Sequence, residues 1–156
     1  IAKEKKFPRM VSIQNNYSLV NRIFDISHSE VSIRENCGLL AYSPLAGGRL
    51  SGKYIEGTKT NNSRYNLWPK RVSGRNTTRG ESAIIKYVKL AKKYHLTPST
   101  LANAFVNSRP FVKSNIVGAN SIKQLEENIN SVGVVLTEDI LSDIEAIHVS
   151  EPNPCP

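Results

Sequence analysis

The chain has 156 residues, of which 39% are hydrophobic and 22% charged, and its formal net charge is +8. This composition fits one globular domain or part of a larger one, and it excludes a disordered tail, a collagen-like fibre and a coiled coil. No apolar run approaches the roughly 18–20 residues that a bilayer span requires, so no membrane-spanning segment is expected.

The cysteines and histidines are few and scattered. Cys37 and Cys155 form no CxxC pair, and the three histidines show no ligand spacing. We therefore expect no disulfide scaffold, no zinc ribbon and no metal site. A reducing compartment such as the cytoplasm is the expected location.

Charge is distributed unevenly along the chain. Residues 49–93 contain 12 Lys and Arg against 2 Asp and Glu, whereas residues 120–151 contain 1 against 7. A basic segment attracts nucleic acid, a membrane surface or a phosphorylated ligand, and it is equally typical of a solvated helix face with a loop. Nucleic-acid binding would require aromatic side chains among the basic ones. The segment offers Tyr65, Trp68, Lys70 and Arg71, and this function ranks below those considered next.

The first half of the chain predicts two strands, one helix and a long loop. A short strand is expected at residues 11–13, and residues 19–35 have helical character with Gly38 as the expected C-cap. The compact apolar run at residues 39–42 predicts a strand covered on both faces. Residues 43–80 lack periodicity and are interrupted by Gly and Pro, so they predict one long functional or mobile loop.

The second half is more regular. Residues 81–94 predict an amphipathic helix, and Thr97 with Pro98 predicts the start of another. A short strand is expected at residues 115–118, and residues 121–124 fit a capping box that begins the following helix. A final helix is expected to start at Thr137.

The predicted order of strands and helices indicates an α/β fold with a parallel sheet. Three such strands cannot close a barrel. They fit an open sheet, or about strands six to eight of a (β/α)₈ TIM barrel with their helices. Because the sequence begins IAKEKK without Met, we favour the second interpretation. Residues 1–156 would then be a single partial domain, the C-terminal part of an incomplete barrel.

Three segments follow the C-terminal ends of the predicted strands, where parallel α/β folds bind ligands. The first is residues 14–17. In the second, Tyr42 could stack on a planar ring or be an ordinary core residue beside a glycine turn. In the third, Gly118 precedes a helix start, where free N–H groups and the helix dipole favour a phosphate. A plain capped helix explains that spacing equally well.

Three motifs in these segments resemble the aldo-keto reductases, in the branch that includes Tas-type oxidoreductases and potassium-channel β subunits. They are QNNYSLVNR at 14–22, LAYSPLAGGRLSGKY at 40–54 and IVGANSIKQLEENI at 116–129, and they occur in the family's order. The resemblance covers nearly the whole chain. It implies a (β/α)₈ barrel that binds NADPH without a Rossmann domain and reduces aldehydes and ketones by hydride transfer.

The same resemblance implies a role for individual residues. Gln14 would hold the nicotinamide carboxamide, and Tyr42 would stack on the nicotinamide ring. Arg64 is the candidate for the 2′-phosphate, which makes NADP the expected cofactor. The pyrophosphate would lie along Ser43, Pro44, Leu45, Ala46 and Gly48, with Lys53 nearby. The adenosine end would be held by Gly118, Asn120, Gln124, Glu127 and Asn128, of which Glu127 and Asn128 would accept from and donate to adenine.

The family's acid–base set is an Asp, a Tyr, a Lys and a His, which precede the first motif. Tyr17, His28 and Tyr42 do not match those positions, so no catalytic residue is assigned. The resulting hypothesis is the NADP-binding C-terminal half of an aldo-keto reductase for a small carbonyl substrate, inactive without its N-terminal half. The alternative is a non-catalytic NADP-binding regulatory or assembly subunit. The carbonyl substrate and the oligomeric state, including a homo-oligomer, stay open.

Overall fold

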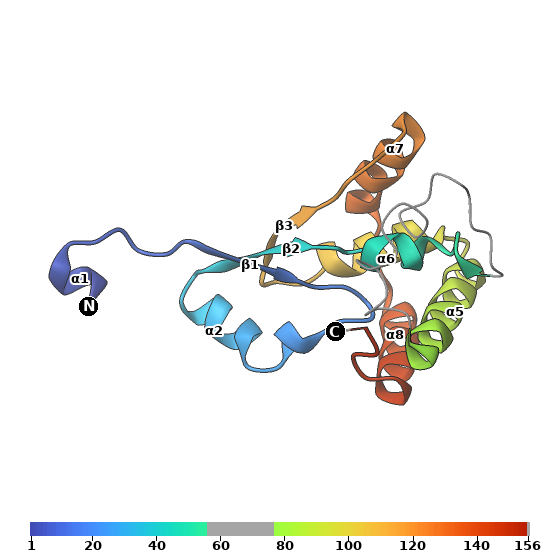
Figure 1. Ribbon diagram of the computed structural model, residues 1–156, viewed down its shortest axis with the longest axis horizontal. Helices are drawn as coiled ribbons and strands as arrows, with labels where there is room; N and C mark the ends of the chain where they lie inside the picture. The colour runs from blue at the N-terminus through green and yellow to red at the C-terminus, as the bar shows by residue number, and fades with distance from the viewer. Residues whose placement is uncertain (56–76, 156) are drawn as a thin grey trace.

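The computed structural model describes residues 1–55 and 77–155 of the chain. In this part of the chain, three parallel strands form a sheet with helices packed against one side (Figure 1). The strands are β1 (Ser12–Asn16), β2 (Gly38–Tyr42) and β3 (Val112–Ile116). The α-helices are α1 (Ala2–Lys5), α2 (His28–Arg34), α5 (Thr78–Lys93), α6 (Pro98–Asn107), α7 (Ile122–Asn130) and α8 (Glu138–Ser150), and the 3₁₀ helices are η1 (Ile23–Asp25), η2 (Ala46–Ser51) and η5 (Ser131–Gly133).

The strand order β1-β2-β3 brings the C-terminal ends of all three strands to one edge of the sheet. Asn16 pairs with Tyr42, and Tyr42 pairs with Ile116. The prediction of successive βα units with a parallel sheet is therefore confirmed. The sheet stays open, as expected for part of a barrel.

One face of the sheet is buried under helices. Leu39 and Ala41 of β2 are fully buried, because alternate side chains of a strand point to the same face. Leu101 and Phe105 of α6 meet this face, and the ring of Tyr17 stacks on Phe105 with 6.0 Å between centroids. This packing forms a single apolar core that the sequence periodicity of α6 predicted.

The opposite face of the sheet is open, which corrects one prediction. Gln14 of β1 and Tyr42 of β2 are exposed. Leu40, which pairs with Gln14 and precedes Tyr42 by two residues on the same face, is half-buried. We expected β2 to be covered on both faces. It is covered on one, because three strands do not curve far enough to enclose their own inner side.

The single helix expected over residues 19–35 is wrong. The chain instead forms a bridge between Ser18 and Asn21, the short helix η1 and then α2. Ser27 has a left-handed φ of 63°, which interrupts the helix between η1 and α2. Gly38 is the first residue of β2 and not a C-cap, and Asn36, with φ 48°, makes the turn.

The helices of the second half are confirmed. Thr97, Ser121 and Thr137 each accept a hydrogen bond from the backbone N–H three residues later, at the starts of α6, α7 and α8. β3 lies three residues earlier than expected, since Val112 pairs beside Leu39. Within the described residues, no helix is long and apolar enough to cross a membrane.

Candidate functional site

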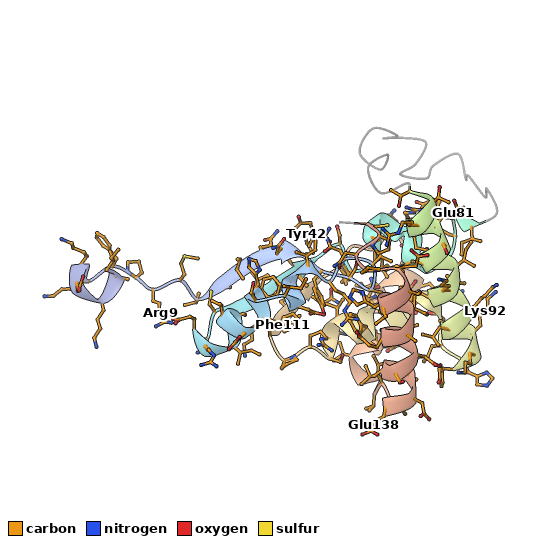
Figure 2. The ribbon with its side chains drawn as sticks, turned by 90° about the horizontal axis from the view of Figure 1, so that it is seen from below. Arg9, Tyr42, Glu81, Lys92, Phe111 and Glu138 are labelled. Atoms are coloured by element: carbon orange, nitrogen blue, oxygen red, sulfur yellow. The ribbon has the colours of Figure 1, made fainter. Side chains whose placement is uncertain are left out.

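The ends of β1 and β2 place two of the expected ligand-binding side chains on one surface. Gln14 pairs with Leu40, and Tyr42 lies two residues further along β2, so Gln14 and Tyr42 share the open face. The backbone N–H of Tyr17 donates to the carbonyl of Tyr42 over 3.3 Å and fixes the two strand ends together. Tyr42 retains 37% of its surface exposed, so its ring is accessible (Figure 2).

The loop after β2 turns sharply through backbone conformations that are rare for side-chain-bearing residues. Ser43 and Ala46 have φ values of 58° and 49°, and Gly47 and Gly48 follow with 70° and 93°. Left-handed residues other than glycine cost about 1 kcal/mol each and concentrate at functional loops. Pro44 and Ala46 are buried, so side chains from this loop anchor it to the core.

Lys53 lies against this turn. A Cβ at position 48 would lie 3.4 Å from Lys53 Cε, an ordinary contact distance, so the lysine side chain runs directly beside Gly48. The ammonium of Lys53 lies 5.0 Å from the centroid of the Tyr54 ring. Ser51 donates to the carbonyl of Gly48 over 2.7 Å and closes the turn. The loop thus presents an exposed cation beside a rigid backbone.

The segment after β3 leads into the start of α7. A Cβ at Gly118 would meet no atom within 4 Å, so the space beside this residue is open. Ser121 caps α7 by accepting from the N–H of Gln124. The Gln124 side chain accepts from the N–H of Asn120 over 2.9 Å, so the reciprocal bond reaches one residue before the cap.

Two residues expected at an adenosine are engaged with the neighbouring helix α6. Glu127 accepts a hydrogen bond from the hydroxyl of Thr97, the N-cap of α6. Asn128 is buried, and its Oδ1 accepts from Asn103 over 2.9 Å. These contacts fix α7 against the start of α6.

The remaining expected features lie elsewhere. Arg64 and the aromatic–basic cluster of the nucleic-acid hypothesis fall outside the described residues. An apolar cavity of about 1200 Å³ lies at the opposite, N-terminal end of β1, where Met10, Phe24 and Val31 contribute to its lining. Among the described residues, no cluster of His, Cys, Asp and Glu could hold a metal ion.

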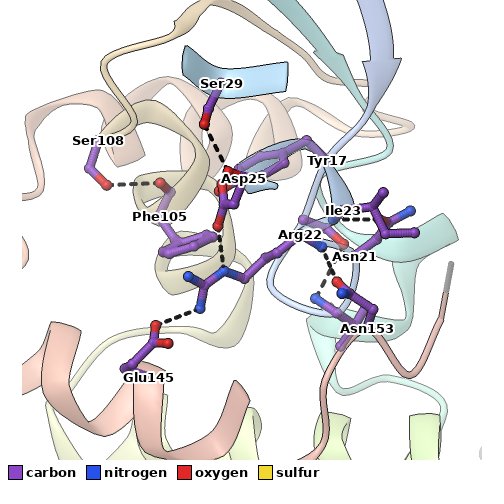
Figure 3. Close-up of polar contacts among 12 residues, drawn as sticks. Tyr17, Asn21, Arg22, Ile23, Asp25, Ser29, Phe105, Ser108, Glu145 and Asn153 are labelled. Carbon is purple, nitrogen blue, oxygen red and sulfur yellow. Dashed lines mark hydrogen bonds and ion pairs between the residues drawn. The ribbon is translucent and has the colours of Figure 1, made fainter. Parts of the chain in front are cut away.

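Beneath the sheet end lies a charged network that the sequence analysis missed (Figure 3). The buried Arg22 pairs with Asp25 and Glu145, at 2.8 Å each. Asp25 also accepts from the Tyr17 hydroxyl over 2.7 Å. Burial and the Asp25 carboxylate raise the pKa of Tyr17, and hydrogen bonds to both carboxylates raise the pKa of Arg22 against its burial. Because Glu145 is 123 residues from Arg22, no local pattern could predict this network.

A model of the aldo/keto reductase family matches residues 1–149 of this chain. The chain belongs to the aldo/keto reductase family. Within it, the chain is 42% identical over 158 residues to "Protein tas" of Escherichia coli, covering 100% of this chain and 45% of that protein. It is 35% identical to a probable voltage-gated potassium channel subunit beta of Arabidopsis thaliana, covering 74% of this chain and 36% of that protein.

A solved structure shows the same fold. The glycerol dehydrogenase of Gluconobacter oxydans superposes with a TM-score of 0.72 at 21% identity, over 96% of this chain and 45% of that one. The chain thus spans about half the length of the relatives that it matches. The family resemblance and the incomplete barrel predicted from the three motifs are confirmed.

Proposed function

We propose that the chain is the dinucleotide-binding part of an NADPH-dependent aldo-keto reductase that reduces a small aldehyde or ketone. One observation supports this most: Gln14 and Tyr42 share an exposed face at the edge where all three strands end. NADPH would supply the hydride. No catalytic residue is proposed in this chain, because the acid–base residues that the resemblance implies have no matching position here.

The residues present fit such a cofactor. The accessible ring of Tyr42 offers a stacking surface for nicotinamide, and Gln14 beside it offers an amide for the carboxamide. Ser43, Pro44, Leu45, Ala46 and Gly48 would line the pyrophosphate, with the exposed Lys53 near its charge. The open space at Gly118 and the start of α7 would receive the adenosine end, with Asn120, Gln124, Glu127 and Asn128 around it.

The proposal is tested by titrating NADPH into the protein and following the cofactor's fluorescence. Tyr42→Ala should weaken binding about tenfold through loss of stacking, whereas Tyr42→Phe keeps the ring and should bind as the wild type does. Gln124→Ala should weaken binding by releasing the Asn120 segment. A wild-type protein that binds no NADPH would refute the proposal.

We also propose NADP rather than NAD, with Arg64 as the residue for the 2′-phosphate. Arg64→Ala should weaken NADPH binding about tenfold and leave NADH binding unchanged, since only NADPH carries that phosphate. Equal losses for both dinucleotides would contradict the assignment. Tight binding without reduction of any carbonyl compound by the full-length protein would favour the regulatory-subunit alternative.

A further inference from the structure

A chain of hydrogen bonds between side chains links β3, α6 and α7. Asn115 Nδ2 donates to Asn103 Oδ1 at 3.3 Å and to Asn107 Oδ1 at 3.0 Å. Asn107 Nδ2 donates to Ser131 Oγ at 3.2 Å, and Asn103 Nδ2 donates to Asn128 Oδ1 at 2.9 Å. Asn103, Asn128 and Ser131 are buried, whereas Asn107 and Asn115 are half-buried, so the Asn103–Asn128 bond forms away from solvent.

The donor and acceptor of every bond in this hydrogen-bond network follow from the backbone carbonyl of Asn128. Ser131 Oγ lies 2.6 Å from the carbonyl oxygen of Asn128, which can only accept, so the single hydroxyl hydrogen is used there. Ser131 Oγ must then accept from Asn107, which turns Asn107 Oδ1 toward Asn115. Asn115 must therefore present Nδ2, and its two hydrogens serve Asn107 and Asn103.

The same sequence of constraints fixes the last two amides. Asn103 presents Oδ1 to Asn115, so its Nδ2 faces Asn128, and Asn128 must present Oδ1 in return. Asn115 Oδ1 is left buried with no partner among the described residues, which is the cost of this arrangement. Asn128 Nδ2 has no hydrogen-bond acceptor in the described part of the chain, and the residue keeps 7% of its surface exposed, which leaves this amide group for a ligand.

We propose that Asn103 is a positioning residue that makes Asn128 a fixed hydrogen-bond donor toward the adenine of a bound nucleotide. The inference rests on the proposed dinucleotide function. The new element is that the side-chain amide of Asn128 cannot rotate by 180°. A rotated amide would place its Nδ2 against Asn103 Nδ2, so that two donors would face each other. An amide locked in this orientation selects a base that offers an acceptor at that point.

Asn103→Asp should reverse the orientation of Asn128. An ionised carboxylate only accepts, so it would still take the hydrogen from Asn115 and would draw Asn128 Nδ2 inward. Asn107→Asp is the matched control, because it places the same charge one turn along α6 and still accepts from Asn115. It gives up the donor to Ser131, whose hydroxyl can donate to the new carboxylate instead. Asn103→Leu removes the constraint without adding charge.

The first measurement needs no nucleotide. In the wild type, NMR should detect a scalar coupling through the hydrogen bond from Asn103 Nδ2 to the side-chain carbonyl carbon of Asn128. The Asn128 amide protons should exchange readily with water. In Asn103→Asp these protons should shift downfield and become protected as the carboxyl group ionises with rising pH, and in Asn107→Asp they should not. If the wild-type Asn103 amide protons exchange readily and the coupling to Asn128 is absent, the proposal is overturned. This result stands even if every variant fails to fold.

The second measurement is base selectivity, with adenosine 2′,5′-bisphosphate and its 1-deaza and 7-deaza forms as probes. The wild type and Asn107→Asp should bind one deaza form about tenfold more weakly than the parent, since it lacks the acceptor. Asn103→Leu and Asn103→Asp should reduce that ratio to below about threefold. Unchanged selectivity in both Asn103 variants would refute the positioning role. Failure of all three probes to bind, with the NMR result intact, would refute the nucleotide function and leave the amide orientation standing.

Discussion

Arg22 is the residue on which the packing beneath the sheet end depends most. Its side chain is 10% exposed, and its guanidinium joins Asp25 of η1 to Glu145 of α8. The guanidinium carbon lies 5.4 Å from the ring centroid of Phe105. Arg22→Met should destabilise the protein by about 3 kcal/mol, because it leaves the largely buried Asp25 carboxylate without its cation. The measurement is urea denaturation followed by circular dichroism.

Glu145→Gln is the control for that prediction. The Glu145 side chain is 54% exposed, so removing its charge should cost less than about 1 kcal/mol. Equal losses for Arg22→Met and Glu145→Gln would mean that Asp25 tolerates its isolation. The Arg22 network would then contribute little to the stability of the fold.

His148 should make the stability of the protein depend on pH. Burial, and then the nearby Arg22, lower the pKa of His148 from its ordinary 6.5, although Glu145 and Asp25 act in the opposite direction. The unfolded chain therefore binds a proton at a higher pH than the folded chain does. The full stability is present above about pH 6.5 and falls as the pH drops below that value toward the folded pKa.

The test compares the wild type with His148→Gln in urea denaturation from about pH 8 to pH 5. The difference in free energy of unfolding between the two proteins should change in favour of the glutamine variant as the pH falls. Carboxylates such as Asp143, whose pKa is lowered by Lys93, contribute equally to both proteins and cancel. A pH-independent difference would exclude His148 as the source.

At the scale of helices and strands, local sequence signals predicted where helices start better than how the segments between strands fold. The caps at Thr97, Ser121 and Thr137 were predictable because each bond spans three residues. The break at Ser27, with a φ of 63°, was not predicted. The Arg22 N–H just before η1 donates to Asn153, 131 residues away, and a contact over that distance leaves no local signal. The motifs named the candidate site residues, and their roles stay predictions. Asn103, which donates to Asn128, had no local signal.

Thr77 ties the start of α5 to the C-terminal segment. Its hydroxyl oxygen accepts from the N–H of Gly80 at 2.9 Å and donates to the carbonyl of Pro154 at 3.0 Å. Thr77→Ala should destabilise the protein by about 1–2 kcal/mol by removing both bonds, measured by thermal denaturation. Thr77→Ser keeps the hydroxyl and should stay near the wild type. A serine variant as unstable as the alanine variant would assign the effect to the lost methyl group.

At the scale of the whole molecule, apolar surface lies exposed on helix α7, and the sheet has two edge strands. Helix α7 projects from the body, and its apolar stripe Ile122, Leu125 and Ile129 is 77%, 47% and 61% exposed (Figure 1). The sequence predicted that these residues share a face, but it could not reveal that the face lacks a cover among the described residues. β1 and β3 are the edge strands of the sheet, and unpaired edges with apolar neighbours favour association.

We therefore expect the 156-residue chain to self-associate through α7 and the open sheet. Ile122→Glu combined with Ile129→Lys should shift it toward monomer, and these charges also suit the N- and C-terminal ends of the helix dipole. The control Val149→Lys changes a 70% exposed residue on α8 and should leave the association unchanged. Light scattering coupled to size-exclusion chromatography over a range of concentrations distinguishes these outcomes. A wild-type chain that stays monomeric and unfolds cooperatively would show that the exposed stripe and the sheet edges do not drive association.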